Sequence, residues 1–178
     1  MRLIKTDIPD LLILESNPNH DGRGYFHRLF DAAVFESADI DFIPRQSGIS
    51  HNLRAGTLRG LHYQTGRSSQ AKLVRCLRGK LFDVAVDLRP ASITYRRWFG
   101  IELSENDHRA LFVPAGFAHG FLTIQDRTDI LYELSNAENV NEAAGIRWND
   151  PIFGIRWPGT PVVINERDTN YPDFAARK

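Results

Sequence analysis

The chain has 178 residues and a mass of 20.3 kDa, the size of one ordinary domain, so we expect a single domain over residues 1–178. Its 22 basic and 22 acidic side chains give a net charge of zero and a pI near 7.0, which provides no overall field to attract nucleic acid or an anionic membrane. Any anionic ligand must therefore be bound by charges gathered locally.

Cysteine content and apolar runs indicate the expected compartment. Cys76 is the only cysteine, so no disulfide within the chain is possible and nothing points to an oxidising compartment. The first apolar run, residues 11–14, is too short for a signal peptide. The longest, residues 110–124, contains a proline and a histidine and is too short to span a bilayer. We therefore expect a soluble, cytoplasmic protein that contacts neither membrane nor nucleic acid.

The first third of the chain alternates short apolar segments with turn-forming residues. Residues 11–14 predict a short strand, and residues 23–30 predict a second one after a run of turn residues. Asp31 is placed to cap a short helix over residues 32–38, whose alanines favour that state. Residues 46–52 have no strong period and are interpreted as a strand.

From Thr57 onward, short β-rich segments are separated by turn signals about every eight to twelve residues, which is typical of an all-β sandwich or barrel. Residues 71–77 and 81–88 flank Arg78-Gly79-Lys80 and predict a hairpin, and alternation places Asp83 opposite the bulky apolar face. Further strands are expected at residues 98–103, 111–113, 118–124 and 130–135, and an irregular tail over the core at residues 151–157 and 165–174.

Ionisable side chains are concentrated between residues 59 and 72, on strand-like sequence. An isolated histidine such as His62 is more often a hydrogen-bonded core residue, but Lys72 in an apolar run is costly to bury without a partner or a purpose. A neutral imidazole can remove a proton next to a carbonyl, a cation can stabilise the enolate, and a phenol such as Tyr132 can return a proton from the opposite face. Tyr132 can equally be a core tyrosine with its hydroxyl at the rim.

A metal site is the alternative use of the two strand histidines. His119 ends the pattern P-x-G-x-x-H of cupin barrels, and His62 lies on a second expected strand. Metal-binding cupins usually supply His-x-His followed by a glutamate, whereas the five residues after His62 include no acidic side chain. We therefore expect no bound metal and no other cofactor.

Five motifs occur in a defined order along the chain. They are Arg59-Gly60-Leu61-His62-Tyr63-Gln64, Ala71-Lys72-Leu73-Val74-Arg75, Asp83-Val84-Ala85-Val86-Asp87-Leu88-Arg89, Pro114-Ala115-Gly116-Phe117-Ala118-His119-Gly120-Phe121 and Trp148-Asn149-Asp150-Pro151. With them the chain resembles the dTDP-4-dehydrorhamnose 3,5-epimerase family, from about residue 23 to about residue 168. The resemblance implies a mainly β, cupin-type jelly roll with short peripheral helices, which acts as a metal-free homodimer on a nucleotide-linked 4-keto-6-deoxy sugar.

The resemblance also implies catalytic roles. His62 matches the general base that removes the proton next to the C4 ketone, and Asp168 matches the carboxylate that orients this histidine. Lys72 matches the cation that stabilises the enolate, and Tyr132 matches the acid that delivers a proton from the other face.

Five further residues match substrate contacts. The resemblance implies that Arg59 and His119 contact the sugar and phosphates, and that Arg23, Phe26 and Gln46 hold the nucleotide, partly across the dimer.

The direction of the Arg59 side chain is in tension with that role. Strict alternation places Arg59 and His62 on opposite faces of one strand, although the family uses both in its pocket. A bulge at Gly60 is one way to re-aim one of them.

Three departures from the family pattern lie in parts expected to hold the base and the sugar. Arg28 stands where the family usually has glutamate, Gly48 where it has asparagine, and Glu138 at a position that is often aromatic. They reflect either drift in a peripheral shell or a different nucleotide, sugar or choice of epimerised carbons.

The expected function is therefore 3,5-epimerisation of dTDP-4-dehydro-6-deoxyglucose to dTDP-4-dehydrorhamnose, a step of dTDP-rhamnose and polysaccharide biosynthesis. A mono-epimerase that acts at C3 or C5 of a different nucleotide sugar is a close variant. A catalytically silent sugar-nucleotide-binding cupin and a metal-dependent cupin oxygenase are the alternatives from other classes.

Overall fold

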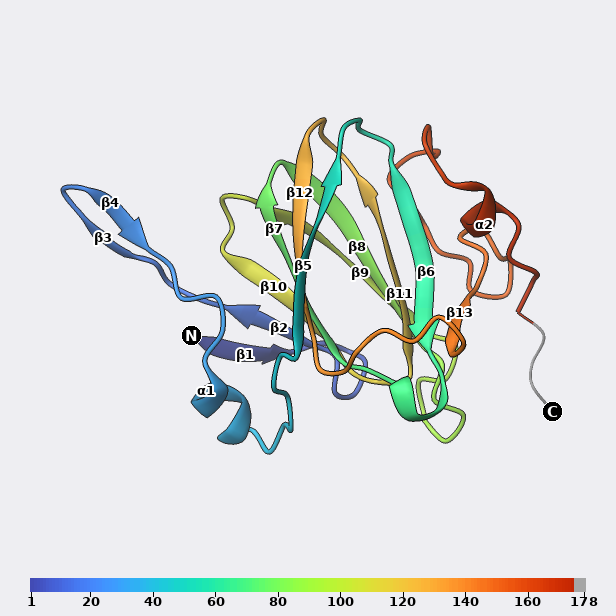
Figure 1. Cartoon of the computed structure of the whole chain (residues 1–178), viewed down its shortest axis with the longest axis horizontal. Helices are drawn as coiled ribbons and strands as arrows, with labels where there is room; N and C mark the ends of the chain where they lie inside the picture. Colours follow the sequence, from blue (N-terminus) through green and yellow to red (C-terminus); the bar gives the residue numbers. More distant parts are fainter. Residues whose placement is uncertain (175–178) are drawn as a thin grey trace.

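The computed structural model describes residues 1–174 and consists mainly of two antiparallel sheets that face each other (Figure 1). This arrangement confirms the expected mainly β class. The six-stranded sheet has the order β1 (Arg2–Lys5), β2 (Leu12–Glu15), β10 (Arg109–Val113), β7 (Lys72–Arg78), β12 (Thr128–Leu134) and β5 (Gln46–Asn52). The five-stranded sheet has the order β13 (Ala143–Gly145), β6 (Leu58–Gln64), β11 (Phe117–Thr123), β8 (Lys80–Asp87) and β9 (Trp98–Ser104).

The smaller elements lie outside these sheets. The helix predicted after Asp31 is present, and the Asp31 carboxylate accepts a hydrogen bond from the backbone N–H of Ala33. No helix within residues 1–174 has the length and apolarity that a membrane span requires. The elements outside the two sheets are a hairpin of β3 (Asn19–Asp21) and β4 (Gly24–Phe26), the helices α1 (Ala32–Glu36) and α2 (Glu166–Thr169), and the 3-10 turn η1 (Gly66–Ser68).

The strand predicted over residues 23–30 is only partly correct, because β4 ends at Phe26. The next two residues contact segments outside the hairpin. The ring of His27 contacts the hydroxyl of Ser16, and Arg28 forms an ion pair with Asp31, which precedes α1. The hairpin itself projects away from the two sheets (Figure 1).

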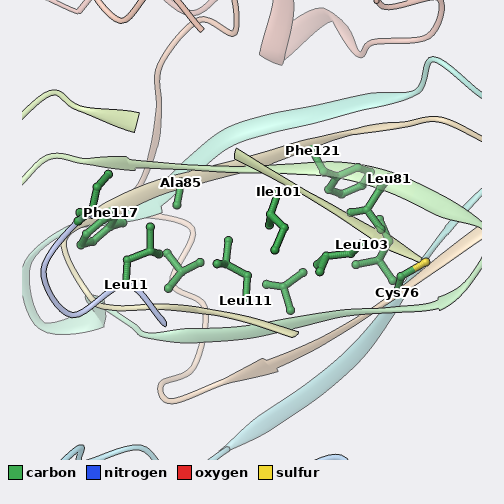
Figure 2. Packing of buried hydrophobic residues seen from close by; sticks show 13 residues of the cluster. Leu11, Cys76, Leu81, Ala85, Ile101, Leu103, Leu111, Phe117 and Phe121 are labelled. Carbon is green, nitrogen blue, oxygen red and sulfur yellow. The ribbon is translucent and has the colours of Figure 1, made fainter. Parts of the chain in front are cut away.

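The main core fills the space between the two sheets, and β8 is covered on both faces. Leu81 and Ala85 point into this core (Figure 2), whereas Val84 and Val86 pack under the C-terminal tail. The predicted alternation is therefore correct, and Asp83, which shares its face with Leu81 and Ala85, points into the interior of the molecule.

The expected bulge in β6 is present at Gly60. In the pairing of β6 with β11, His62 faces His119 and Arg59 faces Phe121, so three residue steps on β6 oppose two on β11. Gly60 has a φ of +130°, a conformation that L side chains rarely adopt. The extra residue offsets the alternation and turns Arg59 and His62 toward the same side of the strand.

Substituting Gly60 tests this geometry. A Cβ atom at this position would lie 2.6 Å from Gly120 Cα and 3.0 Å from the carbonyl oxygen of His119, in a strained backbone conformation. We expect Gly60→Ala to lower the free energy of unfolding in urea by about 2–4 kcal/mol. Gly159→Ala is the control, because a Cβ there has no neighbour within 4 Å. Equal stability of the two variants would contradict the argument.

Candidate active site

A cavity of about 530 Å³ opens between the two sheets and collects most of the sequence-predicted site residues. Its wall combines side chains of β6 and β11 from one sheet with side chains of β5, β7 and β12 from the other. The predicted residues in the wall are Gln46, Arg59, His62, Lys72, His119 and Tyr132, and the others are Ser47, Gly48, Ile49, Ser50, Leu134 and Glu138.

His62 is held from behind by Asp168. The imidazole Nε2 lies 2.7 Å from Asp168 Oδ1, and the second carboxylate oxygen accepts the N–H of Gly60 at 2.9 Å. Asn165 caps α2 and accepts the N–H of Asp168 at 2.6 Å, which fixes the buried carboxylate. Burial by itself raises the pKa of Asp168, but the hydrogen bonds from His62 and Gly60 outweigh it and hold this pKa below its usual value.

Two residues near His62 were missed in the sequence. Arg167 Nη2 lies 3.2 Å from His62 Nε2, and the ring of Tyr171 is edge-on to the imidazole at 6.2 Å. A guanidinium only donates hydrogen bonds and a carboxylate only accepts them, so His62 Nε2 cannot bond to Arg167 and to Asp168 in one protonation state. The shorter contact to Asp168 favours the tautomer with a proton on Nε2, which leaves Nδ1 of His62 as the basic atom.

Lys72 enters the cavity from the facing sheet. Its ammonium donates a hydrogen bond to the backbone carbonyl of His62 at 3.3 Å, which places a cation beside the imidazole. Burial lowers the pKa of Lys72 to about 8, against the opposing effect of the carboxylates of Glu138 and Asp83. The lysine is therefore close to losing its charge at neutral to mildly basic pH.

A second imidazole–carboxylate pair lies beside Tyr132. His119 Nε2 is 2.8 Å from Asp83 Oδ1, and both residues are buried. The ring of Tyr132 is edge-on to that of His119 at 5.8 Å, and burial raises the pKa of the Tyr132 phenol well above its ordinary value. The sequence analysis assigned no role to Asp83, and its predicted position opposite the bulky apolar face of the strand was the available signal.

The bulge brings Arg59 into the same cavity as His62. Arg59 Nε donates to the side-chain oxygen of Asn52 at 2.9 Å, and Nη2 donates to the backbone carbonyl of His51 at 3.4 Å. The guanidinium is therefore held at the open side of the cavity by residues of β5.

Arg23 and Phe26 are not brought to this cavity within one chain. Both lie on the projecting β3–β4 hairpin, where Phe26 is 65% exposed and Arg23 forms an ion pair with Asp21 (Figure 1). Arg28, at the base of the hairpin, has its charge compensated by Asp31 at 2.7 Å.

The other two departures from the family pattern lie in the cavity wall. A Cβ atom at Gly48 would have no neighbour within 4 Å, so the position borders open space in the cavity. Glu138 is exposed, and its backbone N–H donates to the side-chain oxygen of Gln46 at 3.2 Å. Within residues 1–174, no three His, Cys, Asp or Glu side chains are grouped as a metal site requires.

Known proteins resemble the chain over nearly its whole length. The sequence profile of the dTDP-4-dehydrorhamnose 3,5-epimerase family matches residues 5–176. A dTDP-4-dehydrorhamnose 3,5-epimerase from Shigella flexneri is 41% identical over 177 residues, which are 98% of this chain and 96% of the relative.

Solved structures agree with this match and with the expected cupin-type fold. The crystal structure of dTDP-4-dehydrorhamnose 3,5-epimerase from Elizabethkingia anophelis has a TM-score of 0.93 and 38% identity, and the match covers 98% of this chain and 96% of that one. A 3'-monoepimerase from Streptomyces bikiniensis, in complex with dTDP-quinovose, has a TM-score of 0.88 and 30% identity, with 97% and 87% covered. The chain belongs to the dTDP-4-dehydrorhamnose 3,5-epimerase family, and the protein is an isomerase.

Proposed function

We propose that the protein inverts C3 and C5 of dTDP-4-dehydro-6-deoxyglucose and forms dTDP-4-dehydrorhamnose. The observation that carries this proposal is the arrangement of His62, backed by Asp168, opposite Lys72 and Tyr132 across one cavity. A base and an acid on facing walls can remove a proton from one side of a carbon and return a proton to the other side.

In this mechanism His62 Nδ1 removes the proton next to the C4 ketone, and Asp168 stabilises the resulting imidazolium. The ketone becomes an enolate, whose negative charge the Lys72 ammonium stabilises. Tyr132, kept protonated by its raised pKa, donates its hydroxyl proton to the opposite face of the carbon. Tyr132 then regains a proton from solvent, and the imidazolium of His62 releases its proton to solvent. The product is the inverted ketone, with no net change of atoms or electrons.

A mono-epimerase is the second candidate. The fold supports that activity as well, since the chain is similar to the 3'-monoepimerase from Streptomyces bikiniensis at 30% identity, against 38–41% to 3,5-epimerases. Gly48 and Glu138 also change the size and charge of the cavity wall without touching the His62–Asp168 pair. Such changes can reorient the sugar so that only one carbon faces the base.

We further propose that the active form is a homodimer in which the β3–β4 hairpin of one chain serves the cavity of the other. Arg23 and Phe26 match nucleotide contacts of the family, yet they lie away from the cavity of their own chain. An exposed aromatic ring on a projecting hairpin is suited to a partner surface.

Solvent exchange tests the reaction. In deuterated buffer we expect NMR to detect deuterium at C3 and C5 of the dTDP-linked substrate, and His62→Ala to slow incorporation by about 10²–10⁴-fold. Arg156→Ala, an exposed residue outside the cavity wall and not on the β3–β4 hairpin, is the control and should retain exchange. Label at one carbon alone identifies the mono-epimerase, and absence of exchange with the dTDP, UDP, CDP and GDP forms contradicts an epimerase.

The pKa of Lys72 predicts the basic limb of the pH profile. The ammonium form is required, and its pKa is about 8, so the exchange rate should fall as pH rises above about 8. Glu138→Gln removes a charge that raises this pKa, so the limb should move to lower pH. Glu36→Gln, exposed on α1, should leave the profile unchanged. A Glu138→Gln limb at or above the wild-type position would refute this coupling.

Mixed dimers test the shared site. Neither an Arg23→Ala/Phe26→Ala chain nor a His62→Ala chain should be active alone. A 1:1 mixture refolded together should regain about a quarter of wild-type activity, since about half of the dimers are hybrids and each hybrid holds one intact site of two. A mixture of Lys72→Ala and His62→Ala chains is the control, because both of these residues belong to one chain's cavity. Equal recovery in both mixtures, or none in the first, would count against the shared site.

A further inference from the structure

We propose that Asn52 is a positioning residue that holds the Arg59 guanidinium at the cavity without neutralising it, so that its full charge can bind the diphosphate of the ligand. Asn52 ends β5 and is 2% exposed, whereas Arg59 is exposed in the cavity wall. The diphosphate is that of the nucleotide sugar, so this inference rests on the proposed function.

The Asn52 side chain links three strands. Its Nδ2 donates to the backbone carbonyls of Ser50 at 3.0 Å and of Thr128 at 3.2 Å, and its Oδ1 accepts Arg59 Nε at 2.9 Å. Both carbonyls can only accept and the guanidinium can only donate, so the orientation of the amide is determined. The amide thus fastens β5 to β12 in one sheet and fixes a side chain of β6 in the other.

The neutrality of this partner is the second part of the argument. Both oxygens that bind Arg59 are uncharged, one from the Asn52 amide and one from the backbone of His51. Among the described residues, no carboxylate forms an ion pair with Arg59, whereas Arg89 and Arg109 are each paired with an aspartate. A positioned but uncompensated guanidinium is suited to bidentate binding of phosphate oxygens.

Replacing the amide by a carboxylate separates position from charge. Asn52→Asp keeps an acceptor for Arg59 but adds a negative charge, so we expect calorimetry to show about tenfold weaker binding of dTDP and of inorganic pyrophosphate. The dependence of the dissociation constant on salt should also weaken. In turnover, KM should rise while kcat stays within about threefold of wild type.

Two controls isolate the effect. Gln125→Glu makes the same amide-to-acid change on the exposed connection between β11 and β12, outside the cavity wall, and should leave pyrophosphate binding unchanged. In an Arg59→Ala background, Asn52→Asp should have no further effect on affinity, because Asn52 acts through Arg59.

Two results would overturn the inference. One is a wild-type affinity of Asn52→Asp for pyrophosphate, and the other is that Asn52→Asp weakens pyrophosphate binding as much in the Arg59→Ala background as in the wild-type background. If Asn52→Asp does not fold, Asn52→Ala and Asn52→Ser replace it, and equal pyrophosphate affinity in Asn52→Ala and wild type is then the overturning result. Because pyrophosphate contains no sugar, an Asn52-dependent affinity without any solvent exchange would disprove the epimerase proposal alone.

Discussion

The site depends on the two hydrogen bonds that the Asp168 carboxylate forms with β6. This carboxylate binds the N–H of Gly60 and the imidazole of His62, two groups that the bulge in β6 presents together. A buried donor left without a partner costs about 1–3 kcal/mol, and a buried carboxylate costs more. Each group therefore satisfies the other, although Asp168 and His62 are 106 residues apart in the chain. Docking of α2 and orientation of the imidazole are consequently one event, which ties the C-terminal tail to the chemistry.

The acidic and the basic side chains of the cavity bind different kinds of partner. The buried carboxylates of Asp168 and Asp83 each bind an imidazole, whereas Lys72 and Arg59 bind only neutral oxygens of the protein. The two buried carboxylates are thus hydrogen-bonded to imidazoles rather than paired with the cations, and among the described residues neither Lys72 nor Arg59 forms an ion pair, so their positive charge faces the cavity. A chain with no net charge can in this way still present a local field to an anionic ligand.

Local patterns predicted the parts of the fold that depend on neighbouring residues. Alternation predicted that Asp83 lies opposite the bulky apolar face of its strand, and the glycine in β6 predicted the bulge, since both follow from the geometry of a single strand. The strand over residues 23–30 was predicted too long, because contacts of His27 with a distant segment end it. The hydrogen bond between Asn52 and Arg59 depends on how the two sheets pack together, which the periodicity of a single strand does not predict.

The catalytic roles were predicted from the ordered motifs rather than from any single residue. His62 alone would be interpreted as a core histidine, and only its combination with Lys72 and the later motifs predicts a site. Arg167 and Tyr171 were not predicted, although the resemblance placed their neighbour Asp168 beside His62, because their own contacts with the imidazole depend on how α2 and the residues after it pack against β6. Long-range contacts of this kind become visible only when the register of the bulge and the position of α2 are known.

The outer wall of the cavity is not electrostatically independent of its interior. Gly48 leaves open space at the wall and Glu138 contributes a carboxylate to it, and neither forms a hydrogen bond with the two imidazole–carboxylate pairs. The charge of Glu138 nevertheless acts on Lys72, whose pKa it raises against the effect of burial. A substitution that removes this carboxylate therefore alters both the surface that faces a ligand and the protonation of the group proposed to stabilise the enolate.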